Sequence, residues 1–221
     1  MSLFDSLLLL IDQEPHPASL NMAVDEVVLK ESSVPVLRAY CWLRPSASFG
    51  YFEKYKAVEK QHAGRDLVRR WTGGGVVLHG EDFTYSLMVP AGISLLKINP
   101  AESYRLIHAQ IAKTLQDSGL PAKIASAQAP KISQACFENP VTSDILLDNR
   151  KIAGAAQRRT SHGLLHQGSI QLPNLPPSFA HTLAANLSTQ VVKKSVGQNT
   201  LTAAQTLSEK KYATKSWLSK F

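Results

Sequence analysis

The feature that most constrains this chain is the stretch 69–79, in which two arginines lead into three consecutive glycines and then a histidine. Three residues without a Cβ allow a ligand to lie directly against the backbone. Their N–H groups can also face an anion or a developing negative charge. A glycine triplet alone would be typical of a flexible hairpin tip. The flanking arginines and the β-branched run that follows favour a functional turn, although no lysine stands where a phosphate-binding loop needs one.

The bulk composition predicts a soluble globular protein. With 221 residues, 44% of them hydrophobic and 19% charged, we expect residues 1–221 to form a single domain with a sizeable core. Cys41 and Cys136 form neither a disulfide framework nor a metal-ligand pattern, so we expect no metal site and a reducing, cytoplasmic location. The apolar runs are too short to span a bilayer, and the start lacks the features of a signal peptide, so we expect no membrane partner.

Positive charge is concentrated in the C-terminal third. The net charge is +7; residues 151–221 hold nine Lys/Arg and one acid, whereas residues 1–150 hold 15 Lys/Arg and 16 acids. Such a region favours an acidic partner through complementary potential. Nucleic acid and an acidic protein surface would both satisfy this physics. No zinc knuckle, basic zipper or aromatic RNA-binding signature accompanies the charge, so we do not expect nucleic acid as the partner. Charge that serves only solubility would explain the same distribution equally well.

Hydrophobic periodicity predicts an α+β fold with a mixed or antiparallel central sheet flanked by helices. We expect strands at residues 3–11, 36–43, 48–52, 76–78, 84–89, 122–125, 135–137, 145–147, 151–156 and 163–172. Helices are expected near residues 20–31, 56–62, 99–119, 178–186 and 202–212. Asn99 is positioned to cap the third of these, with Glu102 as its capping-box partner. The same pattern makes Cys41 a small core residue and His108 a surface histidine.

A second dense stretch surrounds Lys151, which opens a predicted strand and is followed by Gly154 and Ala156. Its ammonium group would therefore lie beside positions with little side-chain bulk. A lysine fixed beside a groove can hold a carbonyl oxygen, a carboxylate or a phosphate as a point charge. Taken alone, however, one such lysine would more often be a solvated surface residue.

Together these motifs resemble the lipoate-protein ligase A and octanoyltransferase family, whose catalytic domain has the biotin/lipoate protein ligase fold. The resemblance rests on Arg69-Arg70-x-Thr72-Gly73-Gly74-Gly75-x-Val77-x-His79, Lys151-Ile152-x-Gly154-x-Ala156-Gln157 and Leu164-Leu165-x-x-Gly168-Ser169-Ile170. The motifs occur in the family's order, and weaker agreement extends over almost the whole chain. The resemblance implies substrate-binding roles for Arg70, Thr72, Gly73, Gly74, Gly75, His79, Gly154, Ala156, His166 and Gly168.

Within the family, the chain resembles most the cysteine-dependent octanoyltransferases, which implies Cys136 and Lys151 as catalytic residues. Members of that branch take an octanoyl group from acyl carrier protein and pass it to a lysine of a lipoyl-domain protein, with no cofactor. A thiol needs a lowered pKa or a nearby base to act as a nucleophile, and Lys151, His79 or His166 could supply this help. The alternative for Cys136 is a buried structural cysteine. If Cys136 is the nucleophile, the glycines would form one wall of an apolar acyl slot, where burial contributes about 0.8 kcal/mol per CH₂.

Two other functions remain open at this point. Gly75 stands where the cysteine branch usually has Arg, Asp144 is similar to an aspartate of the ligases, and His166-Gln167 inverts the expected order. These positions favour an ATP-dependent lipoate-protein ligase, which would need ATP and Mg and would form a lipoyl-adenylate. The accessory C-terminal domain that such ligases often carry is not expected within residues 1–221. The third possibility is a non-catalytic relative that binds an acyl group or a nucleic acid.

Overall fold

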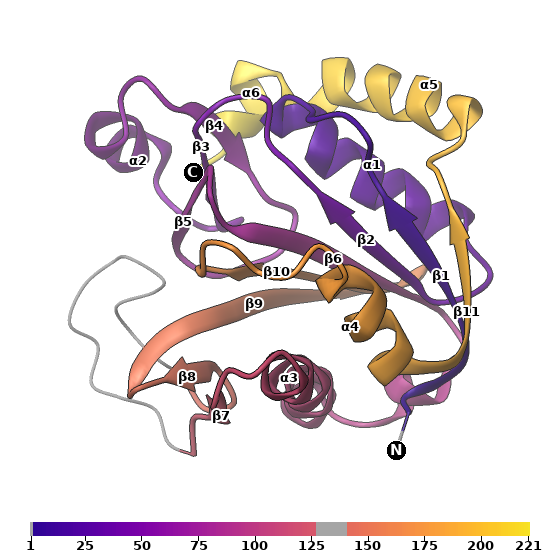
Figure 1. The fold of residues 1–221 in the computed structure, drawn as a ribbon. Coiled ribbons are helices and arrows are strands. Elements are labelled where there is room, and N and C mark those ends of the chain that lie inside the picture. The colour runs from indigo at the N-terminus through magenta and orange to yellow at the C-terminus, as the bar shows by residue number, and fades with distance from the viewer. Residues whose placement is uncertain (1, 127–140) are drawn as a thin grey trace.

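The computed structural model describes residues 2–126 and 141–221, and its centre is a mixed sheet of eight strands (Figure 1). Its strands are β1 (Phe4–Ile11), β2 (Val36–Tyr40), β6 (Phe83–Pro90), β7 (Lys123–Ile124), β8 (Ile145–Leu147), β9 (Arg150–Thr160), β10 (Gly163–Ile170) and β11 (Ser188–Lys194). Their order across the sheet is β11-β1-β2-β6-β10-β9-β8-β7. The pairs β1–β11 and β1–β2 are parallel, whereas the remaining pairs are antiparallel, which confirms the predicted mixed sheet.

A second, smaller sheet lies beside the first and has the order β4-β3-β5. Its strands are β3 (Ser46–Phe49), β4 (Asp66–Arg69) and β5 (Val76–His79). The sequence suggests that β5 and β6 follow one another across a short turn, but β5 pairs with β3 and β6 pairs with β2 and β10. The chain therefore crosses from one sheet to the other at residues 80–82, immediately after β5.

Helices cover both faces of the large sheet (Figure 1). Helices α1 (Ala18–Glu31) and α5 (Gln198–Leu207) lie on one face, and α3 (Pro100–Asp117) and α4 (Phe179–Leu187) lie on the other. Shorter elements are α2 (Tyr55–Gln61), the 3-10 turn η1 (Ser94–Lys97), the π-helical turn η2 (Ser208–Tyr212) and α6 (Lys215–Leu218). None of the described helices has the length and apolar character needed to cross a membrane.

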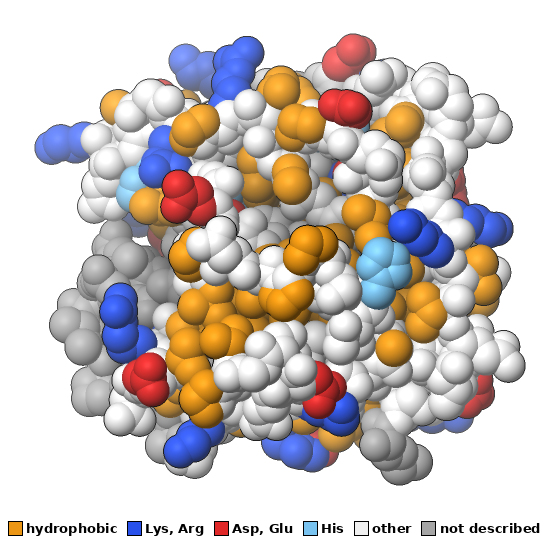
Figure 2. Space-filling model, in the orientation of Figure 1, with side chains coloured by type: hydrophobic (Ala, Val, Ile, Leu, Met, Phe, Trp, Pro, Cys, Tyr) orange, Lys and Arg blue, Asp and Glu red, His pale blue; other side chains and the backbone are white. Residues whose placement is uncertain are grey.

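The core is divided by the large sheet into two hydrophobic layers. Leu9 and Leu37 face α3 and α4 in one layer, whereas Leu10 and Val36 face α1 and α5 in the other. This division follows from the two-residue period of a strand, which turns neighbouring side chains to opposite faces. Figure 2 shows hydrophobic side chains gathered over the middle of one face of the molecule, with Lys and Arg mainly around its outline.

Local sequence signals explain several element boundaries. The Asn99 side chain accepts a hydrogen bond from the N–H of Glu102 and Pro100 opens α3, as predicted. The expected second half of the capping box is wrong, because the Glu102 carboxylate pairs with Arg105 instead. Between β8 and β9, Asp148 and Asn149 have φ of 49° and 62°, the left-handed values that a tight hairpin turn needs.

Two burial predictions are wrong. Strand β2 ends at Tyr40, so Cys41 does not continue the buried face of the strand and is exposed. His108 is fully buried although it lies off the main apolar stripe of α3, because its Nδ1 bonds the carbonyl of Ser143 and its ring packs on Tyr104. A polar side chain can enter the core where such a partner is available. The predicted strand at residues 135–137 lies outside the described part of the chain.

Candidate functional site

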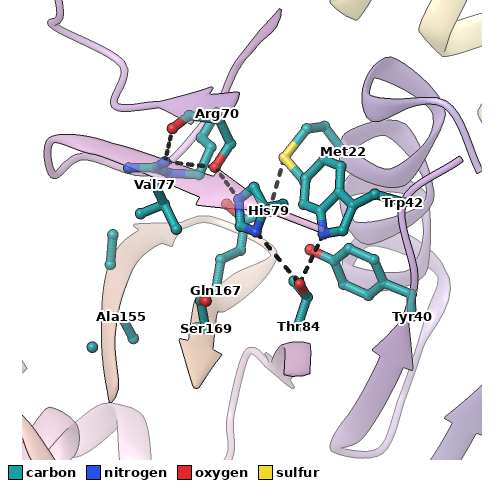
Figure 3. A pocket seen from close by; sticks show the side chains of 14 residues that line it. Met22, Tyr40, Trp42, Arg70, Val77, His79, Thr84, Ala155, Gln167 and Ser169 are labelled. Carbon is teal, nitrogen blue, oxygen red and sulfur yellow. Dashed lines mark hydrogen bonds between the residues drawn. The ribbon is translucent and has the colours of Figure 1, made fainter. Parts of the chain in front are cut away.

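A narrow pocket lies between the large sheet and the small sheet (Figure 3). The large sheet contributes residues of β2, β6, β9 and β10, and the small sheet contributes Ser48, Val77 and His79. Its lining is Met22, Tyr40, Trp42, Ser48, Arg70, Val77, His79, Thr84, Gly154, Ala155, Ala156, Gln167, Gly168 and Ser169. Five of the ten predicted binding residues are among them, namely Arg70, His79, Gly154, Ala156 and Gly168.

Arg70 holds the glycine turn in place. Its Nη1 donates to the carbonyl and hydroxyl oxygens of Ser48, at 2.7 and 2.8 Å. Its Nη2 donates to the carbonyls of Gly73 and Gly75, at 2.9 and 2.8 Å. The guanidinium therefore joins the turn to strand β3. Charge-assisted hydrogen bonds of this kind are stronger than neutral ones, so the turn is fixed rather than a flexible tip.

The glycines of the turn support the pocket through neighbours. Gly74 has φ of +84°, and a Cβ on it would lie 3.6 Å from the Cβ of Ala156, which lines the pocket. A Cβ on Gly50 would lie only 1.7 Å from the carbonyl oxygen of Gly74, so the turn packs directly on the backbone at Gly50. The sequence points to the glycines as the wall itself; the structure places them directly behind it.

Arg69 has a different role from its neighbour. Its buried guanidinium donates to backbone carbonyls of Tyr51, Glu53 and Leu218, at 2.6, 2.8 and 2.6 Å. The N–H of the Trp217 indole returns a bond to the carbonyl of Arg69. These contacts attach the C-terminal segment to the small sheet. Arg69 is therefore a structural residue, whereas Arg70 belongs to the pocket.

A buried polar network reaches the pocket from the centre of the molecule. Thr72 Oγ1 donates to Gln167 Oε1, and Gln167 Nε2 donates to Asp25. Asp25 is in turn paired with Arg38 at 2.8 Å. Burial raises the pKa of Asp25, and the charge of Arg38 opposes that rise. Thr72, a predicted binding residue, thus acts by orienting Gln167.

His79 lies on the small-sheet side of the pocket, in a series of hydrogen bonds that links Ser48, His79 and Asp82. Its Nε2 is 2.7 Å from Ser48 Oγ and its Nδ1 is 2.8 Å from Asp82 Oδ2. Burial lowers the pKa of His79 although the Asp82 carboxylate opposes that effect. A neutral ring that donates from Nδ1 to Asp82 and accepts at Nε2 from Ser48 satisfies all three groups. This series fixes the ring and shows the order of a Ser–His–Asp relay, although Ser48 also accepts from Arg70.

Lys151 does not itself line the pocket but lies directly beside Gly154, which lines it at the β9 end. A Cβ on Gly154 would approach the Lys151 Cε and Nζ to 2.7 and 2.9 Å, so only glycine leaves room for the lysine chain. The ammonium pairs with Asp144 at 2.7 Å, and Tyr104 donates to the same carboxylate at 2.6 Å. The predicted small neighbour of Lys151 is therefore present. The side chains of Lys151 and Asp144 are almost fully buried, which makes a solvated surface lysine the wrong description.

His166 is placed away from this pocket. It is buried against α3, where it bonds the Tyr85 hydroxyl and the Gln157 amide. Burial, and then the charge of His108, lower the pKa of His166 well below its ordinary value. Gly168 leaves room for the Tyr85 ring, the same ring that His166 contacts, because a Cβ on Gly168 would lie 2.2 Å from it. The role proposed for His166 as a base or binding residue stays a prediction that this geometry does not favour.

Cys136 lies outside the described residues, so its predicted role as nucleophile rests on the sequence. Six further residues that line the pocket were not among the predicted site residues. These are Met22, Tyr40, Trp42, Ser48, Thr84 and Gln167. The alternation of strands β2, β6 and β10 could have placed Tyr40, Thr84 and Gln167 on one face. No pattern in the sequence marks Trp42, which follows the end of its strand.

The family model of the lipoyl protein ligase A/B catalytic domain matches residues 17–210. The chain belongs to this family. Its membership accounts for the joint presence of the glycine turn and Lys151, which the family resemblance led us to expect.

Curated relatives within the family carry the name octanoyltransferase LipM. The protein from Brevibacillus brevis is 34% identical over 175 residues, and that from Carboxydothermus hydrogenoformans is 36% identical over 169 residues. Each match covers 72% of this chain and 63% of the relative. The chain therefore spans less than two thirds of the length of the relatives it matches.

Solved structures of the same fold confirm the predicted architecture. The T. acidophilum protein Ta0514 with bound lipoic acid has a TM-score of 0.75 and 20% identity, covering 99% of both chains. A lipoate-protein ligase A bound with ATP has a TM-score of 0.76 and 21% identity, covering 98% of both chains. At this identity the likeness concerns the fold alone.

Proposed function

We propose that this chain transfers an octanoyl group to a lipoyl-domain protein, using the pocket between its two sheets. The observation that carries the proposal is the place of Lys151, whose ammonium lies against Gly154 at one end of a narrow pocket. Backbone and small side chains form that end, which suits an alkyl chain lying against the sheet. The LipM relatives, at 34–36% identity, support the same reaction.

The chemistry consists of two acyl transfers. The Cys136 thiolate attacks the thioester carbonyl of octanoyl-acyl carrier protein; a new C–S bond forms, and the carrier leaves as a thiolate that takes up the proton lost by Cys136. A neutral lysine amine of the lipoyl domain then attacks the Cys136 thioester, an amide forms, and the thiol is regenerated with the amine's proton. The Lys151 ammonium stabilises the oxyanion in both steps. No cofactor takes part, and the reaction is cytoplasmic.

Acidic partners suit the charge of this chain. Residues 151–221 carry a net charge of +8, from nine Lys/Arg and one acid. An acidic carrier protein and an acidic lipoyl domain would both be attracted to such a surface, mainly through their association rates. We therefore expect transfer to slow as salt is raised.

A ligase reaction is the second candidate, and Asp144 beside Lys151 is the observation that favours it. Such a reaction activates the free acid with ATP and Mg, and it needs no cysteine. Lys151 fits either substrate, because an ammonium can hold a carbonyl, a carboxylate or a phosphate oxygen.

One experiment separates these reactions. The protein is incubated with an apo lipoyl domain and either octanoyl-acyl carrier protein or octanoate plus ATP, and the domain's mass is followed. We expect a gain of one octanoyl group from the carrier without ATP, and its loss in Cys136→Ala, with Cys41→Ala as the matched control. Modification that requires ATP and survives Cys136→Ala would replace the transferase by the ligase. A folded protein that modifies the domain under neither condition would be a binding relative.

A further inference from the structure

Three positive side chains surround the Trp71 indole just before the glycine turn. Lys211 Nζ, the guanidinium carbon of Arg158 and Lys30 Nζ lie 4.6, 5.0 and 5.8 Å from the centroid of the ring. Arg158 also donates to the Trp71 carbonyl at 3.0 Å. The three cations come from η2, β9 and α1, so only the fold brings them together. These four residues are called the Trp71 cluster.

Positive charge in the Trp71 cluster exceeds the negative charge that balances it. Glu26 accepts from Lys30 at 2.6 Å and from Lys211 at 2.5 Å, and among the described residues it is the one acid that pairs with the cluster. Three cations therefore face one carboxylate. Burial lowers the pKa of Lys211, Glu26 opposes that shift, and the charges of Lys30 and Arg158 add to it. A carboxylate supplied by a partner would relieve this repulsion.

The Trp71 cluster borders an exposed aromatic pair. The Arg158 guanidinium lies 5.1 Å from the centroid of the Tyr51 ring, and Tyr51 packs edge-on against Phe52 with centroids 5.0 Å apart. Phe52 is 74% exposed, and the side chains of Lys30 and Lys211 also reach solvent. Aromatic residues and arginine are enriched in protein interfaces and carry much of their binding energy. Charge and composition therefore fit an acidic protein partner.

This surface is set back from the Lys151 end of the pocket. Gly154, Ala156 and Arg158 alternate on one face of β9, and the first two line the pocket. At ~3.3 Å per residue, Arg158 lies about 13 Å along the strand from Gly154. The Lys151 ammonium packs against Gly154. A partner that docks on the Trp71 cluster must therefore reach over this distance to place an acyl carbonyl beside Lys151.

The required reach distinguishes the two proteins of the proposed reaction. An extended chain advances about 1.2 Å per bond, so a lysine side chain of the lipoyl domain reaches about 6 Å. The phosphopantetheine arm of an acyl carrier protein has about fourteen bonds from its serine to its sulfur and reaches about 17 Å. The longer arm spans the distance from the Trp71 cluster to Gly154, and the lysine side chain does not.

We propose that the Trp71 cluster, together with Tyr51 and Phe52, is the surface on which the acyl carrier protein docks, an inference that rests on the proposed function. Carboxylates of the carrier pair with the three cations, and an apolar side chain of the carrier covers Phe52. The arm then runs along β9 to the Lys151 end, where the lipoyl domain docks directly. The charges act mainly on the association rate, whereas Phe52 acts on the dissociation rate.

The test compares two octanoyl donors, the carrier protein and free octanoyl-pantetheine, which has the thioester without the protein. Transfer to an apo lipoyl domain is followed by mass for the wild type, Phe52→Ala and the double variant Lys30→Gln/Arg158→Gln. We expect kcat/KM for the carrier to fall about tenfold in each variant, because each removes part of the docking surface. The value of kcat/KM for octanoyl-pantetheine and the KM for the lipoyl domain should stay at wild type.

Two exposed positions away from this surface provide matched controls. Lys113 pairs with Asp117 at 2.6 Å, the distance at which Lys30 pairs with Glu26, and Val192 is 53% exposed on the edge strand β11. Lys113→Gln and Val192→Ala should leave the kinetics with both donors unchanged. A loss of carrier-dependent transfer in these controls as large as in the test variants would overturn the assignment of the surface.

The other results separate this inference from the proposed function. A wild type that transfers from neither donor would refute the proposed function, and the inference would fall with it. Equal losses with both donors would show that the variants disturb the pocket, and a raised KM for the lipoyl domain alone would assign the surface to the acceptor. Tighter binding of a single-stranded oligonucleotide than of the carrier, measured by fluorescence anisotropy, would make it a nucleic-acid surface. If the double variant does not fold, Phe52→Ala and Lys30→Gln, both at exposed positions, decide.

Discussion

The two ends of the pocket are built in different ways. The Lys151 end is local: Lys151, Asp144 and Gly154 come from one short stretch around a tight hairpin. The Trp42 end is assembled from residues far apart in the chain, because Trp42 follows β2 and stacks on His79 from the small sheet. Motifs therefore mark the first end, whereas at the second end they mark His79 and not Trp42. The family motifs describe the Lys151 end, whereas the Trp42 end depends on how the two sheets pack.

Lys151→Ala should have the largest effect of these variants, because it removes the buried ammonium group at the Lys151 end of the pocket. We expect acyl transfer to fall at least ~100-fold, since an oxyanion donor is lost. The change also leaves the Asp144 carboxylate buried without its cation, so the free energy of unfolding should drop by about 3 kcal/mol. Transfer is measured by mass on the lipoyl domain, and stability by urea unfolding.

The matched control is Lys113→Ala, which removes an exposed lysine paired with Asp117. Exposed pairs of this kind contribute less than about 1 kcal/mol, so transfer and stability should both stay near wild type. Lys151→Ala combined with Asp144→Ala should recover stability without recovering transfer. Near-normal transfer by the single variant would show that the chemistry does not use Lys151.

Gly50→Ala tests whether the small-sheet side of the pocket depends on the glycine turn at residues 73–75. A Cβ at this position would overlap the carbonyl oxygen of Gly74, so the turn must move away from Arg70 and Ala156. We expect octanoate affinity to fall at least ~10-fold and stability to fall by about 2 kcal/mol, as for other overpacked sites. In the control Gly80→Ala the added Cβ meets nothing within 4 Å, and both measurements should be unchanged. Equal effects of the two variants would remove the turn from the support of the pocket.

The buried histidines predict how the two ends respond to acid. Burial lowers the pKa of His108, beside the Lys151 end, to about 4, and it also lowers the pKa of His79 at the other end. Protons then bind the unfolded chain first, so stability is complete above pH ~6.5 and is lost as the pH falls through the native pKa. For His108 the loss reaches about 3 kcal/mol at pH 4. His108→Gln should flatten the dependence of the unfolding free energy on pH between 6.5 and 4 by this amount, and an unchanged slope would contradict the assignment.

Sequence patterns foretold the fold well where the signal was local. The cap at Asn99 and the apolar periods of the main strands led to elements in their expected places. Strand β11 was missed because, after Ser188, its residues are exposed and it pairs only along one edge with β1, so it lacks an apolar alternation. Such an edge strand is fixed by its partner rather than by its own residues.

The sequence also predicted only those site residues that stand in local motifs. Arg70, Lys151 and Gly154 stand in motifs, so their types and spacing carried information. Trp42 follows the end of its strand and enters the pocket through the packing of the two sheets, which one sequence does not display. His108 and Cys41 were misplaced because their burial depends on a carbonyl partner and on where a strand ends. Periodicity reports faces, and it does not report which polar residue finds a partner in the core.

Asp82→Asn should change ligand affinity least among these variants, and it probes only the Trp42 end of the pocket. The carboxylate accepts from His79 Nδ1 and from Thr84, the two residues that support Trp42. An amide can instead turn its NH₂ towards Nδ1, which would move the ring proton to Nε2 and leave Ser48 without its acceptor. We expect the NMR signals of the His79 ring nitrogens to exchange their protonated and unprotonated values, and octanoate affinity to fall about threefold because the Trp42 indole is held less firmly. Glu81→Gln, the exposed neighbour, should change neither. If the tautomer exchanges while octanoate affinity stays at the wild-type value, then His79 supports Trp42 by contact alone and the hydrogen bonds from Asp82 through His79 serve only to hold Ser48.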